Sequence, residues 1–281
     1  MKRVLVTGAG GQLGSELREL AGADTNWYFF DRESLPLDQP DKLHEAFERI
    51  RPHVCINAAA YTAVDKAETE REQAIAINGT AVRDLAVLCK LHNALLVQVS
   101  TDYVFNGAAQ EPYKEDDPID PLGWYGNSKL LGERVAFECY DNVVVIRTSW
   151  VYSYYGKNFV KTMLRLLGEK ESIGVVADQV GRPTYAADLA AAIIAIVGRD
   201  APAPGIYHYA DAGVISWFDF ATAIKEEIGA SCVVRPITTA EYPTPARRPA
   251  YSVLDTTKIE KTFGLTPPDW RESLRRCLAK F

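Results

Sequence analysis

Short apolar runs alternate with amphipathic stretches along the first half of the chain. The apolar runs, each long enough for one strand, are residues 4–7, 27–30, 54–57, 95–100 and 143–147. The amphipathic stretches have the spacing of helices that bury one face, and they are residues 12–21, 41–50, 74–91 and 129–140. Strands that are apolar along their whole length are buried on both faces. The pattern predicts an α/β fold of Rossmann type, with a doubly wound parallel sheet.

The regular alternation weakens after residue 147. Proline, tyrosine and loop-forming stretches such as 200–205 and 239–249 become frequent there, which predicts a second, smaller C-terminal lobe. One later apolar helix, 186–197, resembles the helices that cover the sheet, so the chain is expected to return to the first domain before it ends. The predicted first domain comprises residues 1–148 and about 180–210, and the predicted second domain comprises residues 149–179 and 211–281.

A glycine-rich loop follows the first predicted strand directly and opens the first predicted helix. Its glycines are Gly8, Gly11 and Gly14 in the segment TGAGGQLG. Without side chains they permit a tight turn, a close approach of the backbone to a pyrophosphate, and close packing of the helix on the strand. Because the strand and the helix stand where this motif needs them, the loop predicts a dinucleotide site rather than a structural turn.

Asp31 ends the second predicted strand, where an acidic residue can hold the adenosine ribose. Arg32 follows it directly. An aspartate favours the free 2′-hydroxyl of NAD, whereas an adjacent arginine can bind the 2′-phosphate of NADP. The pair therefore leaves both NADPH and NADH open as cofactors, and the alternative is a charged surface turn.

Tyr125 and Lys129 are four residues apart at the start of a predicted helix, so they lie on one helix face. A free tyrosine has a pKa of about 10, and a nearby ammonium is expected to lower that pKa, which makes the tyrosine a workable general acid. The spacing alone is common, and its alternative is an exposed pair. Ser100 and Thr101 end the fourth predicted strand, where ligands of parallel sheets bind. Either hydroxyl is therefore expected to bond the carbonyl oxygen that Tyr125 protonates.

Longer segments carry a resemblance to a known family. They are NAAAYTAVD at 57–65, STDYVFNG at 100–107, RTSWVY at 147–152 and DQVGRPT at 178–184. With the glycine loop and the Tyr/Lys pair, they make the chain resemble the extended short-chain dehydrogenase/reductases from end to end, and among them the reductases of sugar nucleotides. The resemblance implies reduction of the 4-keto group of a dTDP-bound 6-deoxyhexulose by NADPH or NADH.

The resemblance also implies that the first domain binds NAD(P) and that the second, the smaller C-terminal lobe, binds the sugar-nucleotide substrate. It further implies roles for individual residues. Tyr125 would donate the proton, Lys129 would hold the nicotinamide ribose, and Thr101 would orient the ketone. The other residues that would line or support the dinucleotide are Gln12, Leu13, Asn57, Ala58, Ala59, Ala60, Tyr61, Asn78 and Ser100. The candidates for binding the dTDP-sugar are Thr101, Asp102, Tyr103, Trp150, Asn158, Arg182, Arg247 and Arg248. The Trp150 ring either stacks on the deoxysugar or only packs against the protein.

The resemblance implies a magnesium-bridged dimer, because some members of this family dimerise through a metal that is bound by a glutamate on the first helix. Glu16 matches that glutamate, but Ala187 stands where a second acidic group is expected, and Asp188 comes one position later. A shift of one residue on a helix turns a side chain by about 100°. The sequence therefore disfavours a bound metal and leaves a monomer and a homodimer open.

Composition narrows the remaining classes. A net charge of −6 disfavours nucleic acid as a partner, because binding phosphates requires an excess of lysine and arginine. No apolar run approaches the length of a membrane span, and glycines interrupt the apolar run at the N-terminus before it could form a signal peptide. Five widely spaced cysteines without a CxxC motif predict reduced thiols. We therefore expect a cytoplasmic enzyme.

Other functions stay open at this point. An epimerase or another sugar-nucleotide 4-ketoreductase would use the same cofactor and the same Tyr/Lys chemistry. A 4,6-dehydratase needs an adjacent Asp and Glu after the threonine, whereas Asp102 and Tyr103 follow Thr101 here. A noncatalytic subunit, resembling the one that regulates methionine adenosyltransferase, is disfavoured because Thr101, Tyr125 and Lys129 are all present.

Overall fold

A six-stranded parallel sheet forms the centre of the larger domain. The structure is a computed structural model, and it describes all residues, 1–281. The strand order is β10-β5-β4-β3-β1-β2. The strands are β1 (Lys2–Thr7), β2 (Thr25–Phe30), β3 (Val54–Asn57), β4 (Leu95–Thr101), β5 (Val143–Thr148) and β10 (Gly205–His208). The predicted doubly wound α/β fold is confirmed. The order reverses between β1 and β3, and sheets of this kind bind ligands at such a point.

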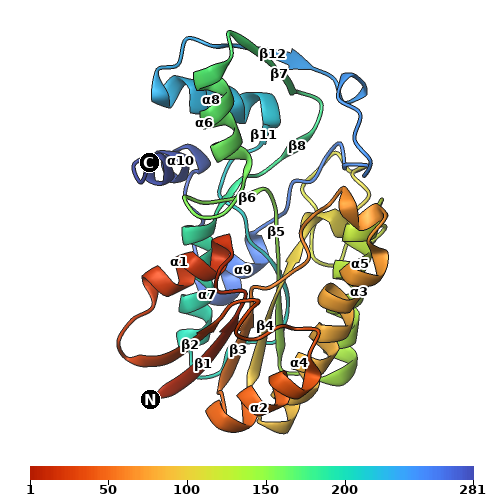
Figure 1. Ribbon diagram of the computed structural model, residues 1–281, viewed down its shortest axis with the longest axis vertical. Helices are drawn as coiled ribbons and strands as arrows, with labels where there is room; N and C mark the ends of the chain where they lie inside the picture. Colours follow the sequence, from red (N-terminus) through yellow and green to blue (C-terminus); the bar gives the residue numbers. More distant parts are fainter.

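Helices cover both faces of the sheet (Figure 1). The helices on one face are α1 (Gln12–Leu20), α7 (Ala186–Gly198) and α9 (Thr257–Phe263), and those on the other are α2 (Pro40–Ile50), α4 (Ala81–Leu91) and α5 (Trp124–Cys139). Successive side chains of a strand point to opposite faces, so Val4 and Val6 enter one core while Leu5 enters the other. Burial on both faces explains why the strands are apolar throughout.

The predicted helix over 74–91 is divided into three parts. It comprises α3 (Arg71–Ile75), a wider π-helical turn η2 (Ala76–Thr80), and α4. The wider turn carries Asn78, whose buried side chain bonds to groups outside the helix. Sequence periodicity does not separate a π-helical turn from the α-helix around it, which is why the prediction shows one helix.

A second lobe lies beyond the carboxyl ends of the sheet strands, in the upper part of Figure 1. Its helices are α6 (Phe159–Glu169), α8 (Trp217–Ile228) and α10 (Trp270–Leu278). Three two-stranded sheets complete it, namely β7 (Ser172–Val176) with β12 (Val233–Ile237), β8 (Val180–Gly181) with β11 (Ile215–Ser216), and β6 (Val151–Tyr152) with β9 (Thr184–Tyr185). These elements share a hydrophobic core of their own, which includes Tyr152, Phe220 and Leu274.

The C-terminal segment contributes to both parts of the molecule. Ile259 and Phe263 of α9 pack in the core on one face of the sheet, whereas the sequence assigns 211–281 to the second domain. The helix α10 packs in the core of the second lobe instead. The segment therefore crosses between the two cores, and the remaining predicted domain boundaries stay a prediction.

Two properties follow from the helices and the cysteines. No helix combines the length and the apolar composition that crossing a membrane requires. All five cysteines carry free thiols, and Cys139 is the only one of them that is not buried.

Candidate active site

A cavity of about 1040 Å³ lies where the sheet meets the second lobe. Its walls come from the segments that follow β1, β2, β3, β4 and β5, and from the first turns of α5 and α8. The cavity thus lies at the carboxyl ends of the strands, as expected for a ligand site on a parallel sheet. Its size is at the upper end of the range for small-molecule and cofactor sites.

The glycine loop packs tightly beneath one end of this cavity. Gly8 has a φ of +71°, and a Cβ there would lie 2.5 Å from the backbone nitrogen of Ala59. A Cβ at Gly14 would lie 2.3 Å from the carbonyl oxygen of Gly8, so a side chain would separate α1 from the loop. Gly8 and Gly11 line the cavity, whereas Gly14 supports the loop from below. The bare backbone before α1 therefore fits the pyrophosphate of a dinucleotide.

Asp31 and Arg32 are exposed at the rim of the same cavity. The Oδ1 atom of Asp31 accepts hydrogen bonds from the backbone nitrogens of Glu33 (3.1 Å) and Ser34 (2.9 Å), and from the Ser34 hydroxyl (2.7 Å). The bonds from Ser34 lower the pKa of Asp31 below its usual value. The carboxylate is thus held in one position, while the Arg32 guanidinium has no ion-pair partner.

Most of the other residues predicted for the dinucleotide also line the cavity. These are Gln12, Leu13, Ala58, Ala59, Ala60, Tyr61, Ser100, Tyr125 and Lys129. Asn57 does not, because its amide accepts from the Thr7 hydroxyl (2.6 Å) and donates to Gln98 (2.8 Å), which ties three strands together.

Asn78 supports the cavity wall from behind. Its Oδ1 accepts from the backbone nitrogen of Tyr61 (2.9 Å), and its Nδ2 donates to the Tyr61 carbonyl (3.0 Å) and to the Ser128 hydroxyl (2.9 Å). That hydroxyl in turn donates to the Tyr125 carbonyl (2.8 Å). One buried amide therefore connects the loop after β3 to the helix that carries Tyr125.

Tyr125, Lys129 and Thr101 meet in this cavity. Burial raises the pKa of Tyr125 to about 12, although the adjacent Thr101 hydroxyl acts to lower it. Burial also lowers the pKa of Lys129 to about 8, and its Nζ donates to the Val99 carbonyl (2.6 Å) rather than to the tyrosine. The expected lowering of the Tyr125 pKa by Lys129 is therefore wrong for this structure. At neutral pH the phenol keeps its proton.

Ser100 and Thr101 point in different directions at the end of β4. The Ser100 hydroxyl donates to Glu133 (2.5 Å), whereas the Thr101 hydroxyl donates to Oδ1 of Asp102 (3.0 Å) and lies beside Tyr125. Of the two hydroxyls, Thr101 is thus the one placed next to the phenol.

Asp102 and Tyr103 line the cavity next to Thr101. Asp102 is only 2% exposed, and its Oδ2 atom has no hydrogen-bond partner. Burial raises the pKa of Asp102 to about 6, while the nearby hydroxyls of Ser252 and Thr101 act to lower it. The Tyr103 ring packs edge-on against Tyr125, with 5.5 Å between the ring centroids. Asp102 therefore places a buried carboxyl group, with one oxygen unpaired, beside Thr101 in the cavity wall.

Trp150 lines the cavity, but its ring already has an aromatic partner. It stacks on Trp217, with 3.6 Å between the ring centroids and 10° between the ring planes. A Cβ at Gly181 would lie 2.7 Å from the Trp150 ring, so the Gly181 backbone also packs directly against the Trp150 ring. The indole pair as a whole forms this wall of the cavity. Trp217 is not recognisable from the sequence as a cavity residue, because it belongs to no motif and lies 67 positions from Trp150.

Four residues predicted to bind substrate lie outside the cavity lining, namely Asn158, Arg182, Arg247 and Arg248. Asn158 caps α6 and donates to Gln12 (2.9 Å). Arg182 donates to the backbone carbonyls of Asp211 and Leu254, both at 2.9 Å. Arg248 pairs with Asp65 at 2.9 Å, and Arg247 is exposed. Arg182 and Arg248 therefore have bonding partners within the protein.

The acidic residues near α1 do not fit a magnesium site. Glu16 is buried and accepts from the Ser153 hydroxyl (2.6 Å) and from Lys280 (3.4 Å). Asp188 pairs with Arg276 at 2.7 Å. Each carboxylate thus has a cation from its own chain.

Gly126 offers a test of how closely Tyr125 must be placed. A Cβ at this position would lie 2.2 Å from the carbonyl oxygen of Tyr103, so Gly126→Ala is expected to push α5 away from η3 (Asp102–Val104). Displacements of about 1 Å at a reacting group can reduce rates about a hundredfold, and we expect kcat to fall by at least about tenfold. Gly168→Ala on α6, where a Cβ meets open space, should leave kcat unchanged. An unaltered kcat in a folded Gly126→Ala protein would contradict this placement.

Comparisons with known proteins agree with this geometry. The family model described as RmlD substrate binding domain matches residues 1–281. The chain is 44% identical over 292 residues to the dTDP-4-dehydrorhamnose reductase of Aggregatibacter actinomycetemcomitans. This alignment covers 99% of each protein. It is 42% identical over 277 residues to a probable dTDP-4,6-dihydroxy-2-methyloxan-3-one 4-ketoreductase of Streptomyces antibioticus, covering 97% of this chain and 93% of the relative. A crystal structure of dTDP-4-dehydrorhamnose reductase from Bacillus anthracis str. Ames in complex with NADP matches over 100% of both chains, with a TM-score of 0.96 and 41% identity.

Proposed function

Because the chain belongs to the family described as RmlD substrate binding domain, we propose that it reduces dTDP-4-dehydrorhamnose to dTDP-L-rhamnose with NADPH or NADH. One observation carries this proposal. The glycine loop, the Thr101 hydroxyl, the Tyr125 phenol and the Lys129 ammonium all line the same cavity. A dinucleotide site and a proton donor therefore lie within reach of one ligand.

The proposed chemistry divides between the cofactor and the chain. The reduced nicotinamide, when bound, supplies the hydride for the C4 carbonyl of the sugar. Lys129 holds the nicotinamide ribose, and Thr101 orients the ketone by a hydrogen bond to its oxygen. Tyr125 donates its proton to that oxygen as the negative charge develops on it. A phenol whose pKa is about 12 carries this proton throughout the neutral range, so it is ready to act as an acid.

The dinucleotide would lie along the backbone before α1 and the segment after β3. The residues proposed to hold it are Gly8, Gly11, Gln12, Leu13, Asp31, Arg32, Ala58, Ala59, Ala60 and Tyr61. The sugar would lie between the Thr101 side of the cavity and the indole pair of Trp150 and Trp217. In this position the sugar would lie against Asp102 and Tyr103 as well, because both residues line the cavity beside Thr101.

A closely related reaction is the second candidate. The similarity to the probable 4-ketoreductase of Streptomyces antibioticus supports reduction of another dTDP-bound 4-keto sugar. Both reactions use the same cofactor and the same proton donor, so they differ only in which sugar fits against Asp102 and the indole pair.

The test is to follow the loss of reduced-nicotinamide absorbance with NADPH and with NADH, using a 4-keto-6-deoxy sugar nucleotide generated in the same tube. Oxidation of the cofactor in proportion to the dTDP-L-rhamnose formed is the expected result. An epimerase would instead retain its cofactor through purification and show no net oxidation. Oxidation only with a different 4-keto sugar would favour the second candidate.

Arg32 is proposed to favour NADPH by binding the 2′-phosphate of its adenosine. Bonds between charged partners contribute about 1.5–3 kcal/mol, so Arg32→Ala should weaken NADPH binding by about ten- to a hundredfold. NADH lacks the phosphate, and its affinity should stay within about twofold. The dissociation constants of both cofactors would be measured by fluorescence, with the exposed Arg49→Ala on α2 as the control. Equal losses for both cofactors would count against this role.

We further propose that the enzyme acts in the cytoplasm and that one chain is the catalytic unit. Five free thiols suit a reducing compartment. The pairing of Glu16 with Lys280, and of Asp188 with Arg276, satisfies within one chain the carboxylates that a metal bridge would use.

A further inference from the structure

Glu133 lies on the same face of α5 as Lys129, one turn further along the helix. Both side chains reach β4. The Lys129 ammonium donates to the Val99 carbonyl (2.6 Å), and the Glu133 carboxylate accepts from the next residue of the strand, Ser100 (2.5 Å). Glu133 is 2% exposed and Lys129 is 4% exposed. The interior of the protein thus holds these two opposite charges one helical turn apart.

Arg147 fixes the Glu133 carboxylate from the neighbouring strand. Its Nη2 donates to Oε2 (2.7 Å) and its Nε donates to Oε1 (3.0 Å). Arg147 on β5 pairs in register with Ser100 on β4, so two adjacent strands hold the same carboxylate. A carboxylate bonded in this way cannot turn away from the helix face that carries Lys129.

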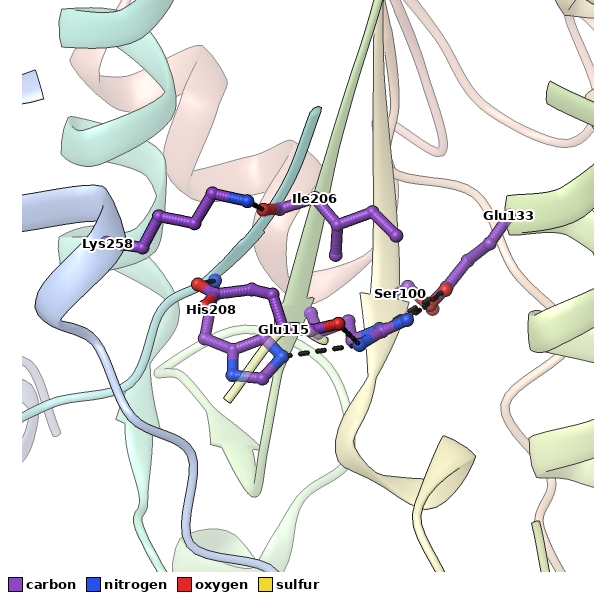
Figure 2. A network of polar contacts seen from close by, with 7 residues as sticks. Ser100, Glu115, Glu133, Ile206, His208 and Lys258 are labelled. Carbon is purple, nitrogen blue, oxygen red and sulfur yellow. Dashed lines mark hydrogen bonds and ion pairs between the residues drawn. The ribbon is translucent and has the colours of Figure 1, made fainter. Parts of the chain in front are cut away.

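The remaining neighbours of Arg147 leave its pairing with Glu133 undisturbed. Figure 2 shows Ser100 and Glu133 at one end of this network, and Glu115 and His208 at the other. The Arg147 guanidinium donates to the Glu115 carbonyl (3.2 Å) and lies 3.5 Å from Nε2 of His208. Burial lowers the pKa of His208 to about 3, so the imidazole is neutral at physiological pH. It adds no second cation to compete for Glu133.

Lys129 has no ion-pair partner, and the anion that favours its charged form is Glu133. Its hydrogen bond goes to a neutral carbonyl, and burial disfavours its charge, which lowers its pKa to about 8. Glu133 is the charged group that acts in the opposite direction. The other titratable groups on α5 are Tyr125, Arg134, Glu138 and Cys139. Those on the elements packed against α5 are Lys66, Glu68, Arg71, Glu72, Arg83, Asp84, Cys89, Lys90, Asp102, Tyr103 and Arg147. None of these groups contributes to the shift in the Lys129 pKa.

We propose that Glu133 is a positioning residue, which aligns Lys129 against β4 and keeps it in the charged form that binds the cofactor ribose. This inference rests on the role proposed above for Lys129. Without the carboxylate, the interior would hold the Lys129 and Arg147 cations with no anion to compensate them. An arginine keeps its proton in such a place, whereas a lysine tends to lose it. The hydroxyls of a ribose would then meet an amine without its positive charge.

The test is the affinity for NADPH as a function of pH, measured by the fluorescence of the bound cofactor without substrate. Lysine is charged below its pKa, so wild-type affinity should fall as the pH rises through a midpoint near 8. In Glu133→Gln we expect that midpoint about one pH unit lower, because a nearby opposite charge shifts a pKa by about that much or more. Glu138→Gln, the same change at an exposed position of the same helix, should keep the wild-type midpoint.

Two further variants test the inference if Glu133→Gln does not fold. Glu133→Gln leaves Arg147 buried without its partner, which is strongly destabilising. The double variant Glu133→Gln with Arg147→Gln removes both charges and should also show a lowered midpoint, because Glu133 is the group that acts on Lys129. Glu133→Asp keeps the carboxylate and should restore most of the wild-type midpoint. A wild-type midpoint in the folded single or double glutamine variant would overturn the inference.

The same measurement separates this inference from the function on which it rests. If the wild type shows no pH midpoint and Lys129→Ala binds NADPH as tightly, Lys129 does not hold the cofactor, and both ideas fall. If the midpoint exists and depends on Lys129 but not on Glu133, only the positioning role is lost.

Discussion

Replacing Tyr125 by phenylalanine is expected to reduce kcat by a factor of about 10² to 10⁴, the usual contribution of a general acid. The substitution removes the hydroxyl beside Thr101 and keeps the ring that packs against Tyr103. The affinity for NADPH should therefore stay within about twofold, which marks a loss in the reaction step rather than in binding. The measurements are kcat with the sugar nucleotide and the NADPH dissociation constant.

A matched control and a pH profile sharpen this prediction. Tyr28→Phe on β2 removes the hydroxyl of a residue that does not line the cavity, and it should leave kcat unchanged. Because the pKa of Tyr125 is about 12, ionisation of the phenol should not reduce the rate between pH 7 and 9. A fall in rate near pH 8 belongs instead to Lys129. Wild-type turnover in Tyr125→Phe would remove this residue from the proposed chemistry.

Lys129→Met is expected to abolish cofactor binding and yet to stabilise the protein. Burial lowers the pKa of Lys129 from its ordinary 10.5 to about 8. Below pH 8 the lysine is therefore charged in both states, but its charge is buried in the folded chain and hydrated in the unfolded chain. This opposes folding by up to about 3 kcal/mol, at 1.36 kcal/mol for each pKa unit. The opposition weakens as the pH rises from 8 to 10.5, because only the folded chain has then released the proton.

Denaturant unfolding at pH 7 checks this gain, which we expect to be on the order of 1–3 kcal/mol. The Val99 carbonyl keeps the Gln98 side chain as a donor (2.9 Å), so the substitution leaves no buried acceptor unpaired. Lys42→Met, at an exposed position of α2, should change the free energy of unfolding by less than about 0.5 kcal/mol. A destabilised Lys129→Met protein would contradict this prediction, because it would show that Lys129 stabilises the folded chain.

The sequence predicted the sheet, and it predicted that Thr101, Tyr125 and Lys129 lie together, because both depend on local patterns. Strands buried on two faces require continuous apolar runs, and the glycine loop requires residues without side chains at Gly8 and Gly14. Thr101 ends a strand, and Tyr125 lies in the first turn of a helix that packs beside it. In an α/β fold of this kind, these positions bring the residues to one edge of the sheet.

The parts that sequence could not predict depend on contacts between distant segments. Nothing local in the GRPT segment indicates that Arg182 bonds to two backbone carbonyls, or that Trp217 lies against Trp150. The direction of the Tyr125 pKa shift was also beyond reach, because burial outweighs any effect of the lysine one turn away. Such outcomes are decided by desolvation and by competing partners, which appear only when the chain is folded.

The buried amide of Asn78 has a mechanical consequence for the enzyme. Its oxygen accepts from the Tyr61 backbone nitrogen, and its nitrogen donates to the Tyr61 carbonyl and to the Ser128 hydroxyl. That hydroxyl in turn donates to the Tyr125 carbonyl. The segment after β3 and the first turn of α5 are therefore joined by a continuous chain of hydrogen bonds that ends at the Tyr125 backbone. Under the proposed function, this chain fixes the cofactor side of the cavity relative to the residue that donates the proton.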